Sequence, residues 1–213
     1  MKNIIRIIMC SSLLLWATSA KAEWQYGVSL MGGNLSSSGT ETEGSAADTS
    51  TRSKSFDEIF FGGDIYVDYI SGNGITYGVS YVPVDLELGS GKRTDSAGGD
   101  IPGEADTGTR SASADVSDLI TAYANIPMGG AGYYALLGVH MATISTTETL
   151  PNSTYGDDDI FGYQIGFGAK AGNIKTEIFY SDFEDISISG SGGNSNKVTA
   201  DADALTLRFA YGF

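Results

Sequence analysis

Few residues in this chain could carry out chemistry. His140 is the only histidine, and a hydrolytic enzyme would need such a base beside a hydroxyl and a carboxylate. His140 lies two residues after Gly138 in an alternating run, on the face that we expect to point inward. We therefore interpret it as an inward-facing polar side chain instead. Cys10 is the only cysteine and lies near the start of the chain. We therefore expect no catalytic residue and no cofactor.

Acidic residues form two clusters, Asp157-Asp158-Asp159 and Asp201 with Asp203. Carboxylate oxygens of this kind can hold Ca²⁺ or Mg²⁺. Neither cluster has the spacing or the glycine of a calcium loop, so we interpret both as solvated acidic surface and expect no metal site. Divalent ions that bridge these carboxylates to external phosphates remain an alternative.

The first residues predict export. Lys2 and Arg6 precede an apolar run that is too short for a spanning helix, and Ala20-Lys21-Ala22 supplies small residues for cleavage, as in a secretory signal peptide. Removing residues 1–22 from the 213 leaves 191 without cysteine and, with three cations lost, moves the formal charge from −14 to −17. This excludes disulfides and argues against nucleic acid as a partner. We expect one domain, 23–213.

Runs of about ten residues alternate bulky apolar with small or polar side chains, which indicates strands with two unlike faces. In the last run, Leu205, Leu207 and Phe209 alternate with Thr206 and Arg208. Comparable runs begin near residues 24, 60, 75, 134, 161 and 175. An eighth run, from Val116 to Ile126, is ambiguous: either Ile120, Ala122, Ala124 and Ile126 or Leu119, Thr121 and Tyr123 could face outward.

The connections between these runs alternate in length. Tight turns rich in glycine and asparagine occur at 71–74, 127–132 and 171–173, whereas long polar connections occur near 33–57, 89–115, 145–159 and 186–201. Short turns at one end and long loops at the other are typical of bacterial outer-membrane barrels. Because an unpaired strand edge is costly in lipid, we expect an all-β, closed, eight-stranded antiparallel up-and-down barrel in the cell outer membrane of a Gram-negative cell.

The terminal sequence Leu205-Thr206-Leu207-Arg208-Phe209-Ala210-Tyr211-Gly212-Phe213 resembles the last strand of the small outer-membrane barrels that include the OmpA barrel domain and OmpX. In that family the aromatic terminus is read by the barrel assembly machinery. The resemblance implies that Phe209, Tyr211 and Phe213 form this assembly signal. Related lipid A deacylases carry a His-x-Ser motif that faces lipid, whereas this chain has His140-Met141-Ala142.

Two further sets of residues fit a barrel in lipid. The first is an aromatic girdle at the level of the lipid headgroups near the short turns; it comprises Trp24, Tyr26, Tyr69, Tyr77, Tyr133 and Tyr211. The second is a charge network inside the lumen, where Arg208 and Glu177 should pair across adjacent strands and Asp64 and Lys170 are further candidates. An eight-stranded lumen is just wide enough for side chains to fill it, so we expect a plug.

These features predict a non-enzymatic, monomeric barrel with a structural, adhesive or other surface-interaction role. Its expected partners are outer-membrane lipid and lipopolysaccharide, the assembly machinery and an external surface ligand. A narrow porin-like channel for small solutes or ions is the first alternative, because small inward residues such as Gly62 and Gly166 could leave the lumen open. A lipid A-modifying enzyme is the second.

Overall fold

The computed structural model describes residues 23–45, 48–95, 108–149, 153–192 and 197–213. The predicted signal peptide, 1–22, lies outside this part of the chain and stays a prediction. All regular elements of the described residues are β-strands. Among these residues, no helix is long and apolar enough to cross a membrane.

Twelve strands make up the fold. They are β1 (Glu23–Ser45), β2 (Asp48–Ile70), β3 (Thr76–Tyr81), β4 (Leu86–Asp95), β5 (Gly108–Pro127), β6 (Tyr133–Glu148), β7 (Ser153–Thr154), β8 (Asp158–Ala171), β9 (Ile174–Phe183), β10 (Ile186–Ser189), β11 (Ser191–Gly192) and β12 (Lys197–Gly212). β3 and β4 share the third position around the ring, and β9 and β10 share the seventh. β12 pairs with β1 and closes the ring of eight. This confirms the predicted barrel.

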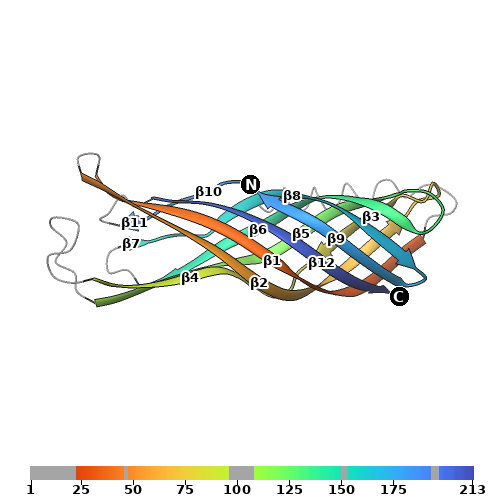
Figure 1. Cartoon of the computed structure of the whole chain (residues 1–213), viewed down its shortest axis with the longest axis horizontal. Coiled ribbons are helices and arrows are strands. Elements are labelled where there is room, and N and C mark those ends of the chain that lie inside the picture. Colours follow the sequence, from red (N-terminus) through yellow and green to blue (C-terminus); the bar gives the residue numbers. More distant parts are fainter. Residues whose placement is uncertain (1–22, 46–47, 96–107, 150–152, 193–196) are drawn as a thin grey trace.

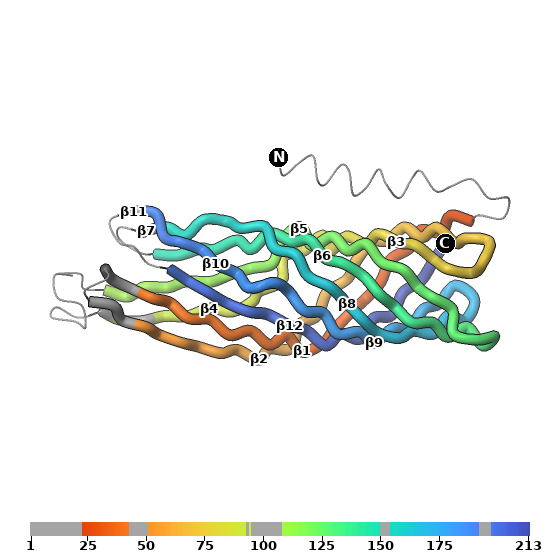
Figure 2. Tube along the Cα trace, turned by 90° about the horizontal axis from the view of Figure 1, so that it is seen from above, coloured from red at the N-terminus to blue at the C-terminus, as the bar shows by residue number. Residues whose placement is uncertain are grey.

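The barrel is long, and its two ends differ (Figure 1). One end, here called the turn end, holds the tight turns after β2, β5 and β8 together with the C-terminus, Phe213. The opposite end, called the loop end, holds the long hairpins. A second view, turned by 90°, shows the same separation (Figure 2). The predicted alternation of short and long connections is therefore present.

Much of each long connection is strand. The ladder between β1 and β2 continues from Glu23–Ile70 to Ser45–Asp48, and β12 stays paired with β1 as far as Thr42–Lys197. Beyond the apolar part of the barrel both faces of a strand can be polar, so the alternation in hydropathy disappears while pairing continues. A prediction from hydropathy alone therefore ends these strands too early and assigns their outer parts to loops.

The outward and inward faces follow the predicted alternation. In β12, Leu205, Leu207 and Phe209 are exposed, whereas Thr206 and Arg208 are buried. The same holds for most of the other apolar runs, which form a continuous belt of exposed apolar side chains around the barrel. Tyr69 and Met141 are exceptions: their alternation points outward, yet both are buried.

A bulge resolves the ambiguous strand. Asp118 has a φ of 52°, and the pairing of β5 with β6 shifts between Ser117 and Ile120. A bulge changes which residues face inward, so Thr121 and Tyr123 face the lumen on one side of it and Val116 does so on the other. The first alternative, with Ile120, Ala122, Ala124 and Ile126 outward, therefore holds after the bulge, and the alternation is reversed before Asp118.

Candidate functional site

The centre of the lumen holds a layer of paired charges. Arg208 of β12 donates from Nη1 to Glu177 Oε2 of β9 at 2.7 Å and from Nη2 to Asp64 Oδ1 of β2 at 2.7 Å. Its Nε donates to Ser29 Oγ of β1 at 3.1 Å. One guanidinium thus ties four neighbouring strands together. Because its donors form a rigid planar fork, this arrangement fixes the strands' relative positions as well as their charges.

A second cation completes the layer. Lys175 Nζ donates to Asp68 Oδ2 at 2.9 Å and lies 3.9 Å from the centre of the Tyr66 ring. Tyrosine hydroxyls satisfy further carboxylate oxygens: Tyr123 donates to Asp68 Oδ1 and Tyr134 to Glu177 Oε1, each at 2.6 Å. Buried charges are tolerated only when they are paired and hydrogen-bonded in this way. We call this set, together with Arg208 and Asp64, the ionic layer.

The structure brings together three of the four residues that we predicted for the lumenal network. Arg208, Glu177 and Asp64 meet, whereas Lys170 lies nearer the turn end and donates to Gln25 Oε1 at 2.9 Å. The network also includes Asp68 and Lys175, which the alternation in their runs also places on the inward face. Its tyrosines carried a weaker signal, because an inward aromatic residue resembles any other core residue.

Inward glycines make room for the large side chains of the ionic layer. A Cβ on Gly27 would overlap the Tyr66 ring, and one on Gly78 would overlap the Tyr123 ring. Each tyrosine lies on the neighbouring strand directly opposite its glycine. Pairs of this kind cover the exposed backbone of a glycine with an aromatic ring. The space at Gly27 and Gly78 is therefore filled by tyrosine rings, and Phe179 likewise lies close to Gly166, whereas a Cβ would fit at Gly62.

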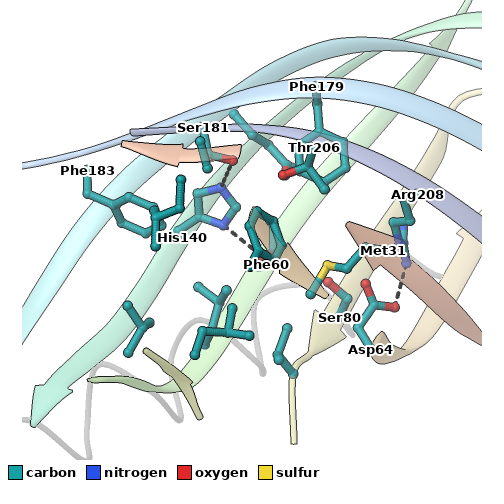
Figure 3. Close-up of a pocket in the computed structure, with 18 of the residues that line it drawn as sticks. Met31, Phe60, Asp64, Ser80, His140, Phe179, Ser181, Phe183, Thr206 and Arg208 are labelled. Atoms are coloured by element: carbon teal, nitrogen blue, oxygen red, sulfur yellow. Dashed lines mark hydrogen bonds and ion pairs between the residues drawn. The ribbon is translucent and has the colours of Figure 1, made fainter. Parts of the chain in front are cut away.

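His140 lies in the next layer toward the loop end (Figure 3). Its ring nitrogens pair with Thr121 Oγ1 at 2.8 Å and with Ser181 Oγ at 3.0 Å, and its ring stacks on Phe183. The adjoining cavity, between His140 and Arg208, measures about 60 Å³. Because hydroxyls occupy both nitrogens, the histidine ties β5, β6 and β9 together as a buried polar side chain.

Above His140 the interior is lined by apolar side chains that pack on one another, here called the apolar layer. The buried members are Leu35, Leu88, Val116, Ala142, Ile144, Ile160, Ile186, Ile188, Ala202 and Ala204. They come from β1, β4, β5, β6, β8, β10 and β12, so they extend around the whole circumference of the interior. An ion on a path along the axis would have to cross both this layer and the ionic layer.

The predicted girdle residues gather at the turn end. Trp24 packs against Tyr69, with ring centres 5.2 Å apart, and Tyr26 stacks on Phe213 at 6.2 Å. Tyr77, Tyr133 and Tyr211 are exposed on the same part of the barrel, while Tyr69 is buried.

The residues of the predicted assembly signal lie on the outer face of β12. Phe209, Tyr211 and Phe213 all point outward and are about half exposed. Phe213 is anchored by its backbone N–H, which donates to the carbonyl of Tyr26 at 2.8 Å.

Similarity to known proteins lies at the level of the fold. No family model matches the sequence, and no curated protein matches it. Solved structures do match. The outer membrane protein OprG from Pseudomonas aeruginosa has a TM-score of 0.49 at 12% identity, over 89% of this chain and 97% of that one. Neisserial surface protein A has a TM-score of 0.42 at 11% identity, over 91% and 100%.

A third match is Ail, the attachment invasion locus protein of Yersinia pestis, solved in complex with the heparin analogue sucrose octasulfate. Its TM-score is 0.37 at 13% identity, over 87% of this chain and 99% of that one. At such low identity these matches describe the fold alone. The closed, eight-stranded antiparallel ring itself follows from the strand pairing of this chain.

Proposed function

We propose that this protein is a plugged, non-enzymatic barrel of the outer membrane that presents its loop end to the outside as an interaction surface. The observation that carries the proposal is the packing of the interior, where the ionic layer and the apolar layer follow one another along the axis. Two such layers support a scaffold rather than a channel. The protein's function then resides in the part of the barrel that extends beyond the membrane.

The outer surface supports this placement in the membrane. Below the loop end, exposed apolar side chains such as Phe61, Ile165 and Leu207 surround the barrel, and water would not favour such a surface. Carboxylates follow directly toward the loop end, with Asp182 and Asp203 opposite each other on β9 and β12. The belt fits a bilayer core, and the carboxylates fit its headgroup boundary.

Cysteine labelling in intact cells tests the orientation. No cysteine occurs after Cys10, so single substitutions Ser55→Cys, exposed on β2 at the loop end, and Asn73→Cys, in a turn at the turn end, give matched sites. A membrane-impermeant maleimide should label Ser55→Cys in intact cells and Asn73→Cys only after lysis. Labelling of Asn73→Cys alone in intact cells would show the opposite orientation, and labelling of neither before lysis would show that the loop end is not displayed.

Release of solute from vesicles tests the plug. Vesicles that contain the purified protein should retain a trapped small sugar as long as protein-free vesicles do, while a conducting porin reconstituted in the same way releases it. Release at the rate of the porin control would contradict the plugged scaffold and support the channel alternative.

A further inference from the structure

The barrel interior reopens above the apolar layer. At the loop end β1, β2, β4, β5 and β6 enclose a cavity of about 470 Å³, far larger than the 60 Å³ beside His140. We call it the vestibule. Its wall includes Gly89 and Gly91 of β4, with the Phe56 ring close to Gly89 and the Lys54 ammonium near Gly91. It is large enough for a small organic molecule.

Cations are concentrated around the vestibule. Arg52, Lys54, Lys92 and Arg110 line it, together with two carboxylates, those of Glu41 and Glu148. The whole chain has 12 lysines and arginines against 26 acidic residues. The vestibule thus has four cations and two carboxylates, so its local charge is positive, opposite in sign to the net charge of the chain. A concave site lined by one sign of charge concentrates ligands of the other sign.

Tyr155 holds the two carboxylates of the vestibule. Its hydroxyl donates to Glu41 Oε1 at 2.8 Å, and its backbone N–H donates to Glu148 Oε1. Glu41 also lies opposite Arg52 in the ladder between β1 and β2. Hydrogen bonds within the wall thus engage one oxygen of each carboxylate.

Within the described residues, the Lys54 ammonium keeps N–H donors available for a ligand. Its Nζ donates to the carbonyl of Ser90 at 3.3 Å and lies 4.2 Å from the centre of the Phe56 ring. Within the described residues β4 pairs with β5 alone, so this bond satisfies a carbonyl on the free edge of β4. An ammonium carries three donors, and the Ser90 carbonyl accepts one of them. Lys92, on the same edge strand, is exposed.

The rest of the wall is largely apolar. Phe56, Ala112, Ala114, Ile188 and Val198 line it, and Ile188 also belongs to the apolar layer beneath. A ligand that fits this arrangement needs an apolar body against these side chains and an anionic group beside the lysines and arginines.

We propose that the vestibule binds a small organic anion with an apolar body, such as an arylalkyl carboxylate. This inference names a ligand class for the surface-interaction role proposed above. The carboxylate would lie between Lys54 and Lys92, with its apolar body toward Ala114 and Ile188. A purely inorganic anion would leave the apolar wall uncovered, and an uncharged analogue would not attract the ammonium groups of Lys54 and Lys92.

The test uses 3-phenylpropanoate as the probe and its amide as the uncharged match. Both are titrated into ¹⁵N-labelled protein in lipid nanodiscs. Binding is monitored by the backbone N–H chemical shifts of Gly89, Gly91 and Ala112. The carboxylate should shift these resonances and bind more weakly as salt rises. Lys54→Gln together with Lys92→Gln should weaken binding by about tenfold or more, whereas Lys197→Gln, which removes one positive charge outside the vestibule lining, should leave it unchanged.

Equal shifts with the amide, no shifts with either compound, or an equal loss with Lys197→Gln would overturn the proposal. If the double variant does not insert, Ala114→Leu provides a second test, because it fills the vestibule without changing charge and should also weaken binding. Failure here leaves the scaffold proposal in place, since vesicle retention and cysteine labelling do not depend on the vestibule.

Discussion

Replacing Arg208 should destabilise the barrel more than replacing its partner Glu177. The ionic layer holds two cations and three carboxylates, all of them buried. Arg208→Gln removes one of the cations and leaves Asp64 and Glu177 without the guanidinium that pairs with both. Breaking a buried pair in this way costs about 3–5 kcal/mol.

Glu177→Gln should be milder. It removes one charge-assisted hydrogen bond, worth about 1.5–3 kcal/mol, while Arg208 keeps its bond to Asp64 and Tyr134 can donate to the new amide oxygen. It also equalises cations and carboxylates in the layer. The double variant should cost less than the sum of the singles, with a coupling of about 1–3 kcal/mol.

Urea unfolding in lipid vesicles measures these differences. Trp24 is the only tryptophan after residue 22, and it lies exposed at the turn end, so its fluorescence reports loss of the barrel. Lys197→Gln, exposed on β12, controls for charge alone and should change stability by less than about 0.5 kcal/mol. Additive single effects, or an Arg208→Gln variant as stable as the parent, would refute the reasoning.

Three further changes test other parts of the structure. Burial, and then Glu87, raises the pKa of Asp115 above its ordinary value of 3.8, so the folded state disfavours its charged form. The contribution of Asp115 to stability should therefore fall as pH rises above about 4. In urea titrations at several pH values the stability of Asp115→Asn relative to the parent should rise over that range, and a profile parallel to the parent's would count against it. Leu207→Arg should cost about 2–4 kcal/mol in lipid vesicles because it places a charge in the apolar belt, whereas Ser55→Arg, exposed on β2 toward the loop end, should cost much less; equal costs would contradict the position of the belt. Deleting Phe213 should lower the heat-modifiable, inserted fraction in outer membranes, and a normal yield would remove it from the assembly signal.

The barrel and its faces were predictable because the bilayer imposes a simple rule. Each residue that crosses the apolar belt faces either lipid or lumen, so the alternation in hydropathy directly encodes the strand. Arg208 and Glu177 could be paired for the same reason, since both are inward charges on adjacent strands. The aromatic girdle could be predicted because its residues lie at the strand ends next to the short turns.

Features that break or escape this rule could not be predicted. The bulge at Asp118 depends on one residue with positive φ, and the polar outer strands have no apolar face to detect. The fit of Tyr123 over Gly78 is a pairing between strands and needs the register. The vestibule likewise combines cations from separate hairpins, and only the ring order brings them together.

Single-channel recording in planar bilayers tests the closed lumen most directly. Purified protein that has inserted, as judged by heat-modifiable migration, should give no stable conductance steps, while a porin reconstituted in the same way conducts. The ionic layer around Arg208 and the apolar layer around Ile144 both predict this silence. Stable, reproducible steps from the parent protein would contradict the account and would make the lumenal charges part of an ion path.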